Sequence, residues 1–188
     1  MDKIIPFSHK LLQEVVSKKD ICVDMTCGNG FDTLFLSDIA RKVFAFDIQD
    51  VAINNTKEKT KDKDNVFVIL DSHENVLDYV KEPVKGAIYN LGYLPCGDKK
   101  LFTSPFSTIS SLEKLLKILD VNGRIVIVCY PGFAEGMDES IKVEEYLKTL
   151  DQKKYSVVTY KFINQINNPP FIIAVERDKW WDVLLVLD

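Results

Sequence analysis

This 188-residue chain has few of the residues that build metal sites or disulfide frameworks. It has two histidines, and its four cysteines, Cys22, Cys27, Cys96 and Cys129, show no Cys-x-x-Cys spacing. Because zinc is usually held by closely spaced cysteines and histidines, the composition predicts no metal site. We expect all four thiols to be reduced, and we place Cys22 and Cys129 in apolar core strands.

Long apolar runs are also absent. No run approaches the roughly 20 residues that cross a bilayer, and residues 1–6 lack the apolar core of a signal peptide, so we expect a cytoplasmic protein. The net charge of −4 does not indicate a nucleic-acid partner, although a local basic patch would be enough to bind a small RNA. With 46% hydrophobic and 28% charged residues, and no linker or internal repeat, residues 1–188 are expected to form one globular domain.

Short apolar runs alternate with amphipathic stretches along the chain, which predicts an α/β fold. We expect a Rossmann-like, doubly wound, mostly parallel seven-stranded sheet with an antiparallel C-terminal strand, because a hairpin through residues 164–170 would join the last two strands. The expected strands are about 20–25, 42–48, 66–70, 86–91, 124–130 (after a turn at Asn122–Gly123), 155–163 and 171–176. The expected helices are about 9–17 (with Ser8 as N-cap), 32–39, 50–63, 74–80, 104–119 and 140–150.

The segment from Asp24 to Thr33, Asp-Met-Thr-Cys-Gly-Asn-Gly-Phe-Asp-Thr, is typical of a strand end, a glycine turn and a helix start. Thr33 stands where a dinucleotide fingerprint has its third glycine, and the Lys of a P-loop is missing. Asp-x-x-x-Gly-x-Gly instead suits S-adenosylmethionine, because glycines let the backbone approach a ligand and an acid such as Asp24 favours its cationic end. The alternative is an ordinary tight turn without a ligand.

Polar residues also follow the second and third expected strands, where a doubly wound sheet binds its ligands. Asp47 is placed to accept both ribose hydroxyls of a nucleoside, Ile48 to cover an adenine face, and the group 71–73 to read the adenine amino edge. Alternatively, these residues cap helices or turns. The predicted cofactor-binding set is Asp24, Cys27, Gly28, Asn29, Gly30, Asp47, Ile48, Gln49, Asp71, Ser72 and His73.

Asn90-Leu91-Gly92-Tyr93 follows the fourth expected strand. It resembles the Asn-Pro-Pro-Tyr loop of methyltransferases that modify amines and exocyclic amino nitrogens, with Gly92 in place of the second proline. Asn90 Oδ1 and the Leu91 carbonyl are suited to accept the N–H bonds of an amine and to aim its lone pair, and Tyr93 is suited to stack on a flat base. The alternative is a strand end followed by a Gly-Tyr turn.

Taken together, these residues resemble a small bacterial family of rRNA methylases, whose members include the tRNA 5-(aminomethyl)-2-thiouridine methyltransferases. The similarity runs from about Ser8 to Arg177. The family commonly has His where this chain has Phe31 and Phe133, so any acid–base role of those histidines does not carry over. The segments that carry the similarity are 24–33, 90–99, 130–132 and 167–170.

The resemblance implies a class I methyltransferase that uses S-adenosylmethionine to methylate the aminomethyl group of the tRNA wobble uridine, with the anticodon stem-loop as its partner. It implies catalytic roles for Asn90, Leu91 and Asp98, where Asp98 or water would receive a proton. An rRNA or small-amine methyltransferase and a noncatalytic cofactor- or RNA-binding module remain alternatives. The apolar residues 179–188 pack either on the core or on a second subunit, as in a homodimer. The predicted substrate-binding set is Tyr93, Leu94, Pro95, Lys99, Tyr130, Pro131, Gly132, Asn168, Pro169 and Pro170.

Overall fold

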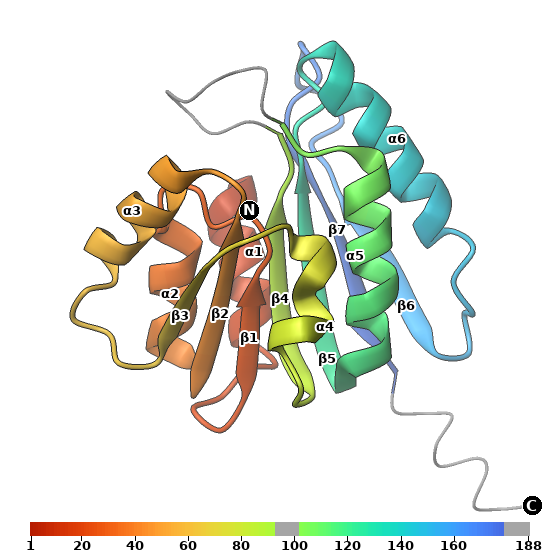
Figure 1. Ribbon diagram of the computed structural model, residues 1–188. Coiled ribbons are helices and arrows are strands. Elements are labelled where there is room, and N and C mark those ends of the chain that lie inside the picture. The colour runs from red at the N-terminus through yellow and green to blue at the C-terminus, as the bar shows by residue number, and fades with distance from the viewer. Residues whose placement is uncertain (93–101, 179–188) are drawn as a thin grey trace, which may run out of the picture.

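The computed structural model describes residues 1–92 and 102–178 and contains a seven-stranded sheet (Figure 1). The strand order is β3-β2-β1-β4-β5-β7-β6; β7 is antiparallel to both of its neighbours, and the other pairs are parallel. The predicted α/β fold with an antiparallel C-terminal strand is therefore confirmed. The strands are β1 Ile21–Asp24, β2 Lys42–Asp47, β3 Val66–Leu70, β4 Val84–Asn90, β5 Leu119–Cys129, β6 Tyr155–Tyr160 and β7 Phe171–Arg177.

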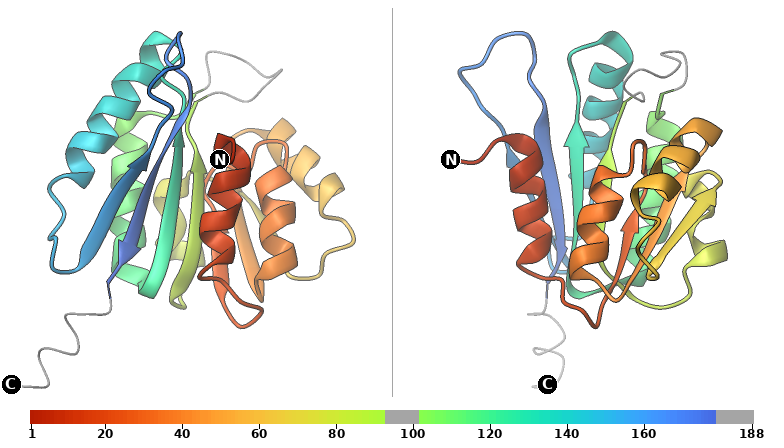
Figure 2. Two further views of the ribbon diagram at one scale, coloured as in Figure 1. Left: turned by 180° about the vertical axis from the view of Figure 1, so that it is seen from behind. Right: turned by 90° about the vertical axis from the view of Figure 1, so that its left-hand side faces the viewer.

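Helices cover both faces of the sheet. Figure 1 shows α4, α5 and α6 in front of it, and the left view of Figure 2, from behind, shows α1 and α2 in front. One layer consists of α1 Ile4–Gln13, α2 Phe31–Ile39 and α3 Asp50–Lys59. The other consists of the 3-10 turn η1 His73–Asn75, α4 Val76–Tyr79, α5 Pro105–Ile118 and α6 Ala134–Leu147.

Neighbouring residues of the central strands point to opposite faces, as the two-residue period of a strand requires. In β1, Val23 belongs to the same cluster as Leu112 of α5. The adjacent Cys22 belongs to a second cluster, with Leu12 of α1 and Leu36 of α2. Because both faces of these strands are buried, their sequences are continuous apolar runs rather than alternating ones.

The parallel strands end at one edge of the sheet, where Asp24, Asp47 and Asn90 are the last residues of β1, β2 and β4. The antiparallel β7 begins at this same edge, because Phe171 pairs with Cys129 at the end of β5. The connection that leads into β7 is therefore brought to the edge at which a doubly wound sheet binds ligands.

The first helix differs from the prediction. It begins at Ile4 rather than near His9, with Lys3 in extended conformation before it. Pro6 lies in the first turn, where its missing N–H leaves no intrahelical bond unmade. Ser8 is consequently inside the helix and buried, and its hydroxyl donates to the Ile5 carbonyl instead of capping the N-terminus.

Four further boundaries differ. β5 begins at Leu119, and the predicted turn at Asn122–Gly123 is a register shift within the strand, with Asn122 at φ 54°. The helix predicted over 140–150 runs from Ala134 to Leu147, since Gly136 allows the helix to lie against the Tyr130 carbonyl. The helix predicted over 50–63 ends at Lys59, and the strand predicted over 155–163 ends at Tyr160.

None of the helices in the two described segments has the length and apolarity needed to cross a membrane.

Candidate active site

A cavity of about 1050 Å³ lies at the carboxyl edge of the parallel strands. It is lined by residues that follow β1, β2, β3, β4 and β5 and by the connection into β7. Most of the predicted site residues are brought together here: Cys27, Gly28, Asn29, Asp47, Ile48, Gln49, Asp71, Ser72, His73, Asn90, Leu91, Tyr130, Gly132, Asn168, Pro169 and Pro170.

The glycine turn forms the start of α2. Gly28 and Gly30 have φ angles of 49° and 75°, the left-handed region that favours glycine. The Gly28 N–H donates to Asp47 Oδ2 at 3.0 Å, and the Gly30 N–H donates to the Cys27 carbonyl at 2.7 Å. A Cβ at Gly30 would lie 2.8 Å from Thr56 Cα of α3, so this glycine also lets the turn pack against the neighbouring helix.

Asp24 lies under the turn rather than in the cavity. It is fully buried and accepts hydrogen bonds from the Thr33 hydroxyl at 2.6 Å and the Thr26 N–H at 3.2 Å. Burial, together with the charge of Asp32, raises its pKa to about 8. The cavity lining does not include Asp24, Gly30 or Pro131, so the structure places these three predicted residues behind the surface that a ligand would touch.

Asp47 combines a structural position with access to the cavity. Its Oδ1 accepts from the Gln49 N–H and its Oδ2 from Gly28, both at 3.0 Å. Burial raises its pKa, and the hydrogen bonds from Gln49 and Gly28 oppose that rise. Ile48 beside it is exposed, as expected of a side chain that covers a flat ligand face.

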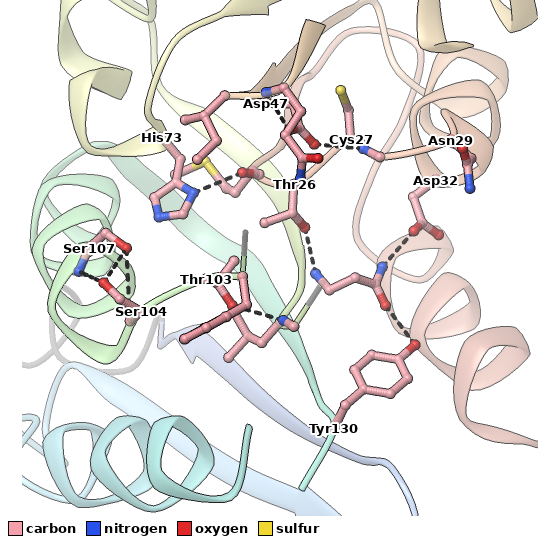
Figure 3. A pocket seen from close by; sticks show the side chains of 18 of the residues that line it. Thr26, Cys27, Asn29, Asp32, Asp47, His73, Thr103, Ser104, Ser107 and Tyr130 are labelled. Carbon is pink, nitrogen blue, oxygen red and sulfur yellow. Dashed lines mark hydrogen bonds between the residues drawn. The ribbon is translucent and has the colours of Figure 1, made fainter. Parts of the chain in front are cut away.

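The three residues after β3, Asp71, Ser72 and His73, have different roles. Asp71 accepts from the Asn75 side chain and from the Tyr79 hydroxyl, both at 2.9 Å, and Ser72 caps η1 by accepting from the Glu74 N–H. The capping alternative thus holds for Ser72, whereas Asp71 bonds to two side chains further along the chain; both residues also line the cavity. His73 is buried, and its Nδ1 lies 3.1 Å from the Met25 carbonyl (Figure 3).

Asn90 is held from three sides. Its N–H donates to Thr26 Oγ1 at 2.7 Å, its Nδ2 donates to Asp32 Oδ2 at 2.6 Å, and its Oδ1 accepts from the Tyr130 hydroxyl at 3.1 Å. Figure 3 shows Thr26, Asp32 and Tyr130 arranged around this position. Burial and the charge of Asp32 raise the pKa of Tyr130 to about 12, so its hydroxyl keeps the proton that it donates.

The backbone after Asn90 rests on a second buried carboxyl group. The Gly92 N–H donates to Thr103 Oγ1 at 2.8 Å, and Thr103 Oγ1 donates to Glu139 Oε2 at 2.6 Å. Glu139 also accepts from the Thr108 hydroxyl at 2.7 Å, and burial raises its pKa. Gly92 and Thr103, which lie close to either end of the segment outside the described residues, are thereby tied to α6.

Sequence reasoning missed several residues that line the cavity. Asp32 belongs to the glycine-turn segment, so its polarity was a usable signal. For Thr103, Ser104 and Ser107, which approach the cavity from the start of α5, the only signal was that Ser104 precedes Pro105 as a helix cap. Five predicted residues, Tyr93, Leu94, Pro95, Asp98 and Lys99, lie outside the described residues.

The predicted cofactor can be tested against these residues. His73 Nε2 is buried and has no hydrogen-bond partner within residues 1–92 and 102–178, which suits a ligand group that donates a hydrogen bond to it. Asp47 supplies a carboxylate and Ile48 an exposed apolar side chain on the same wall. These two acceptors and the apolar side chain fit the nucleoside of S-adenosylmethionine. Within the described segments, no group of three or more His, Cys, Asp or Glu residues is arranged to hold a metal ion.

Comparison with known proteins finds methyltransferases. A sequence model of the family described as "Putative rRNA methylase" matches residues 43–176. A curated Arabidopsis thaliana protein, named tRNA (mnm5s2U34)-methyltransferase, chloroplastic, is 29% identical over 192 residues, covering 94% of this chain and 70% of that protein.

Similar solved structures are also described as methyltransferases or methylases. A Streptococcus mutans protein described as a "putative methyltransferase", in complex with SAH, is 41% identical with a TM-score of 0.89, covering 94% of this chain and 99% of that one. An rRNA methylase from Streptococcus thermophilus is 38% identical with a TM-score of 0.83, covering 95% of this chain and 99% of that one. Both likenesses cover nearly the whole of both chains.

Proposed function

This chain belongs to the family described as "Putative rRNA methylase", and on that premise we propose that it methylates the aminomethyl nitrogen of 5-aminomethyl-2-thiouridine at the wobble position of tRNA. The product would be 5-methylaminomethyl-2-thiouridine. The observation that carries the proposal is Asn90, fixed by three hydrogen bonds at the edge of the cavity. A side-chain amide held in this way suits the recognition of an amine.

The protein is a methyltransferase that uses S-adenosylmethionine. When bound, this cofactor supplies a methyl group attached to a cationic sulfur. We assign Asp47 to the ribose, Ile48 to one face of the adenine and His73 Nε2 to a donor on its edge. The glycine turn is assigned to the methionine part, which its backbone can approach closely.

Asn90 and Leu91 would orient the substrate. Asn90 Oδ1 has a second lone pair besides the one used by Tyr130, and Leu91, whose carbonyl we assign as the second acceptor, lines the same cavity. Two acceptors at the end of β4 would bind two N–H groups of a primary amine and aim its lone pair into the cavity. Orientation of this kind supplies a large part of the rate in transfers between bound reactants.

The name of the Arabidopsis relative and the description of the family point to different RNA substrates. The Arabidopsis relative is named for the wobble uridine of tRNA, and the family description names rRNA. The Asn90 arrangement favours an amine nitrogen in either RNA. The aminomethyl group is a primary aliphatic amine, for which two carbonyl acceptors are well suited, and we therefore prefer the tRNA.

The decisive experiment uses purified protein, S-adenosylmethionine and three substrates in parallel: tRNA that carries the aminomethyl group, the same tRNA without it, and rRNA. Nucleoside mass spectrometry should find methylaminomethyl-uridine only in the first. Methylation of rRNA with no product on the tRNA would replace the proposal by the rRNA alternative.

Asn90→Ala tests the residue that carries the proposal. Turnover should fall by about tenfold or more because the amine loses an orienting acceptor, while S-adenosylmethionine affinity should change little. Asn54→Ala, at an exposed position of α3, is the matched control. If Asn90→Ala turns over at the native rate, residue 90 is only the end of a strand and has no role in orienting the amine.

A further inference from the structure

His9 of α1 is joined to the site by two contacts on one helix. Its Nε2 lies 2.5 Å from Asp32 Oδ1, and its ring stacks on Phe35 with centroids 3.9 Å apart and planes 2° apart. Asp32 and Phe35 are three residues apart in α2 and so share one face of that helix. The two contacts together fix both the position and the plane of the imidazole.

The Asp32 carboxylate connects His9 to Asn90. The two oxygens of a carboxylate are hydrogen-bond acceptors and not donors. The imidazole therefore donates through Nε2–H to Oδ1, and Asn90 donates through Nδ2 to Oδ2. The side chains of His9 and Asp32 are 23% and 15% exposed. A pair shielded to this degree keeps a definite geometry, unlike most ion pairs on open surface.

The orientation of the Asn90 amide follows from this carboxylate. With Nδ2 bound to Asp32, Oδ1 must point away from it, toward the Tyr130 hydroxyl. An amide turned by half a rotation would place its NH₂ group where the substrate amine needs an acceptor. The carboxylate prevents this only while it is held in place itself.

We propose that His9 is a positioning residue for methyl transfer: it holds Asp32, and Asp32 sets the Asn90 amide with its oxygen toward the substrate amine. This inference rests on the proposed role of Asn90 in amine binding. It extends the site to α1, a helix outside the strand–turn–helix unit that carries the glycine motif. Sites whose contacting groups are held by a further layer of hydrogen bonds keep the geometry that reaction requires.

The chain offers a matched pair of variants. His9→Phe keeps a ring to stack on Phe35 and removes the N–H donor, whereas His9→Gln keeps an N–H donor at similar reach and removes the ring. Lys10→Ala, at an exposed neighbour in α1, is the control. If His9 acts through its hydrogen bond, the donor and not the ring decides the outcome.

On the aminomethyl tRNA, His9→Phe should lower kcat by about fivefold to tenfold with KM values for both substrates within about twofold, because orientation is lost and binding is kept. His9→Gln should recover most of kcat. Equal kcat in wild type and His9→Phe would overturn the inference, and so would an equal loss in both variants.

A second measurement does not depend on turnover. In ¹⁵N-labelled protein, the Asn90 side-chain NH₂ signal, identified by its loss in Asn90→Asp, should shift in His9→Phe and stay near its wild-type position in His9→Gln. An unchanged signal in His9→Phe would overturn the inference. If wild-type protein methylates no tRNA, the proposed substrate is wrong, and this spectrum still decides whether His9 orients the amide. If His9→Phe has a lowered melting temperature, His9→Gln becomes the test: native kcat and a native Asn90 signal in that variant would support the inference, and loss of both would overturn it.

Discussion

Two buried carboxyl groups support the two halves of the cavity, and they are built differently. Asp24 supports the glycine turn through Thr26 and Thr33, its neighbours within nine residues. Glu139 supports the backbone at Gly92 through Thr103, and both hydroxyls that it accepts from come from more than 30 residues away. The glycine turn is therefore supported from within its own stretch of sequence, whereas the backbone at Gly92 gains its support only after α5 and α6 have packed together.

Of the substitutions considered, Glu139→Ala should have the largest effect on stability and on methylation. Thr103 and Thr108 would lose their buried acceptor, which should lower the free energy of unfolding by about 2–4 kcal/mol. Methylation of tRNA should fall while S-adenosylmethionine affinity stays near wild type, because the glycine turn that Asp24 supports is untouched. Chemical denaturation and calorimetry would measure the two effects. Glu139→Gln, which keeps one acceptor oxygen, should lose less; equal losses would show that charge rather than hydrogen bonding matters here.

Asp47→Ala should act on the other half alone. It removes the acceptor assigned to the ribose and the one that receives the Gly28 N–H, so S-adenosylmethionine affinity should fall by about tenfold to a hundredfold, or roughly 1.5–3 kcal/mol. The fold and the Glu139 network should persist. Calorimetric titration that finds native affinity would reject the assignment of Asp47 to the cofactor.

Asp24→Asn should change how the free energy of unfolding depends on pH. The pKa of Asp24 is raised to about 8 in the folded protein, so between about pH 4 and 8 the folded state binds a proton that the unfolded state has released. Stability should therefore fall as pH rises through this window, by up to about 1.4 kcal/mol per unit. Asparagine does not titrate and keeps an acceptor oxygen, so the variant should show a flatter profile. Denaturation without cofactor at several pH values measures it; parallel profiles would contradict the protonation of Asp24.

The smallest effect is expected at the thiols, where the two halves should behave alike. Cys27 lies by the glycine turn and Cys129 ends β5; both are free and buried. Burial raises the pKa of Cys129 to about 12 and that of Cys27 well above its usual value. Neither should react with a thiol reagent until the protein unfolds, and reducing agent should leave the melting temperature unchanged. A Cys22–Cys27 bridge in denatured, non-reduced protein would contradict this.

The same contrast explains what the sequence could predict. The mostly parallel sheet, the antiparallel β7 and the gathering of Asp47, His73 and Asn90 at one edge follow from patterns that are local in the chain. The start of α1 was missed because Pro6 was not read as a first-turn residue, and the roles of Glu139 and His9 were missed because their partners are remote in sequence. Asp24 was expected at the ligand because a motif gives a residue's order in the chain but not its depth.

The close contact between the turn and α3 restricts how this sequence can vary. A side chain at Gly30 would meet Thr56 first at its Cα, a backbone atom, and only then at its side chain. Shortening residue 56 therefore cannot make room for a larger residue at 30. A genetic search for second-site suppressors of a Gly30 substitution should return no small residue at 56, and recovery would require a displacement of the whole helix.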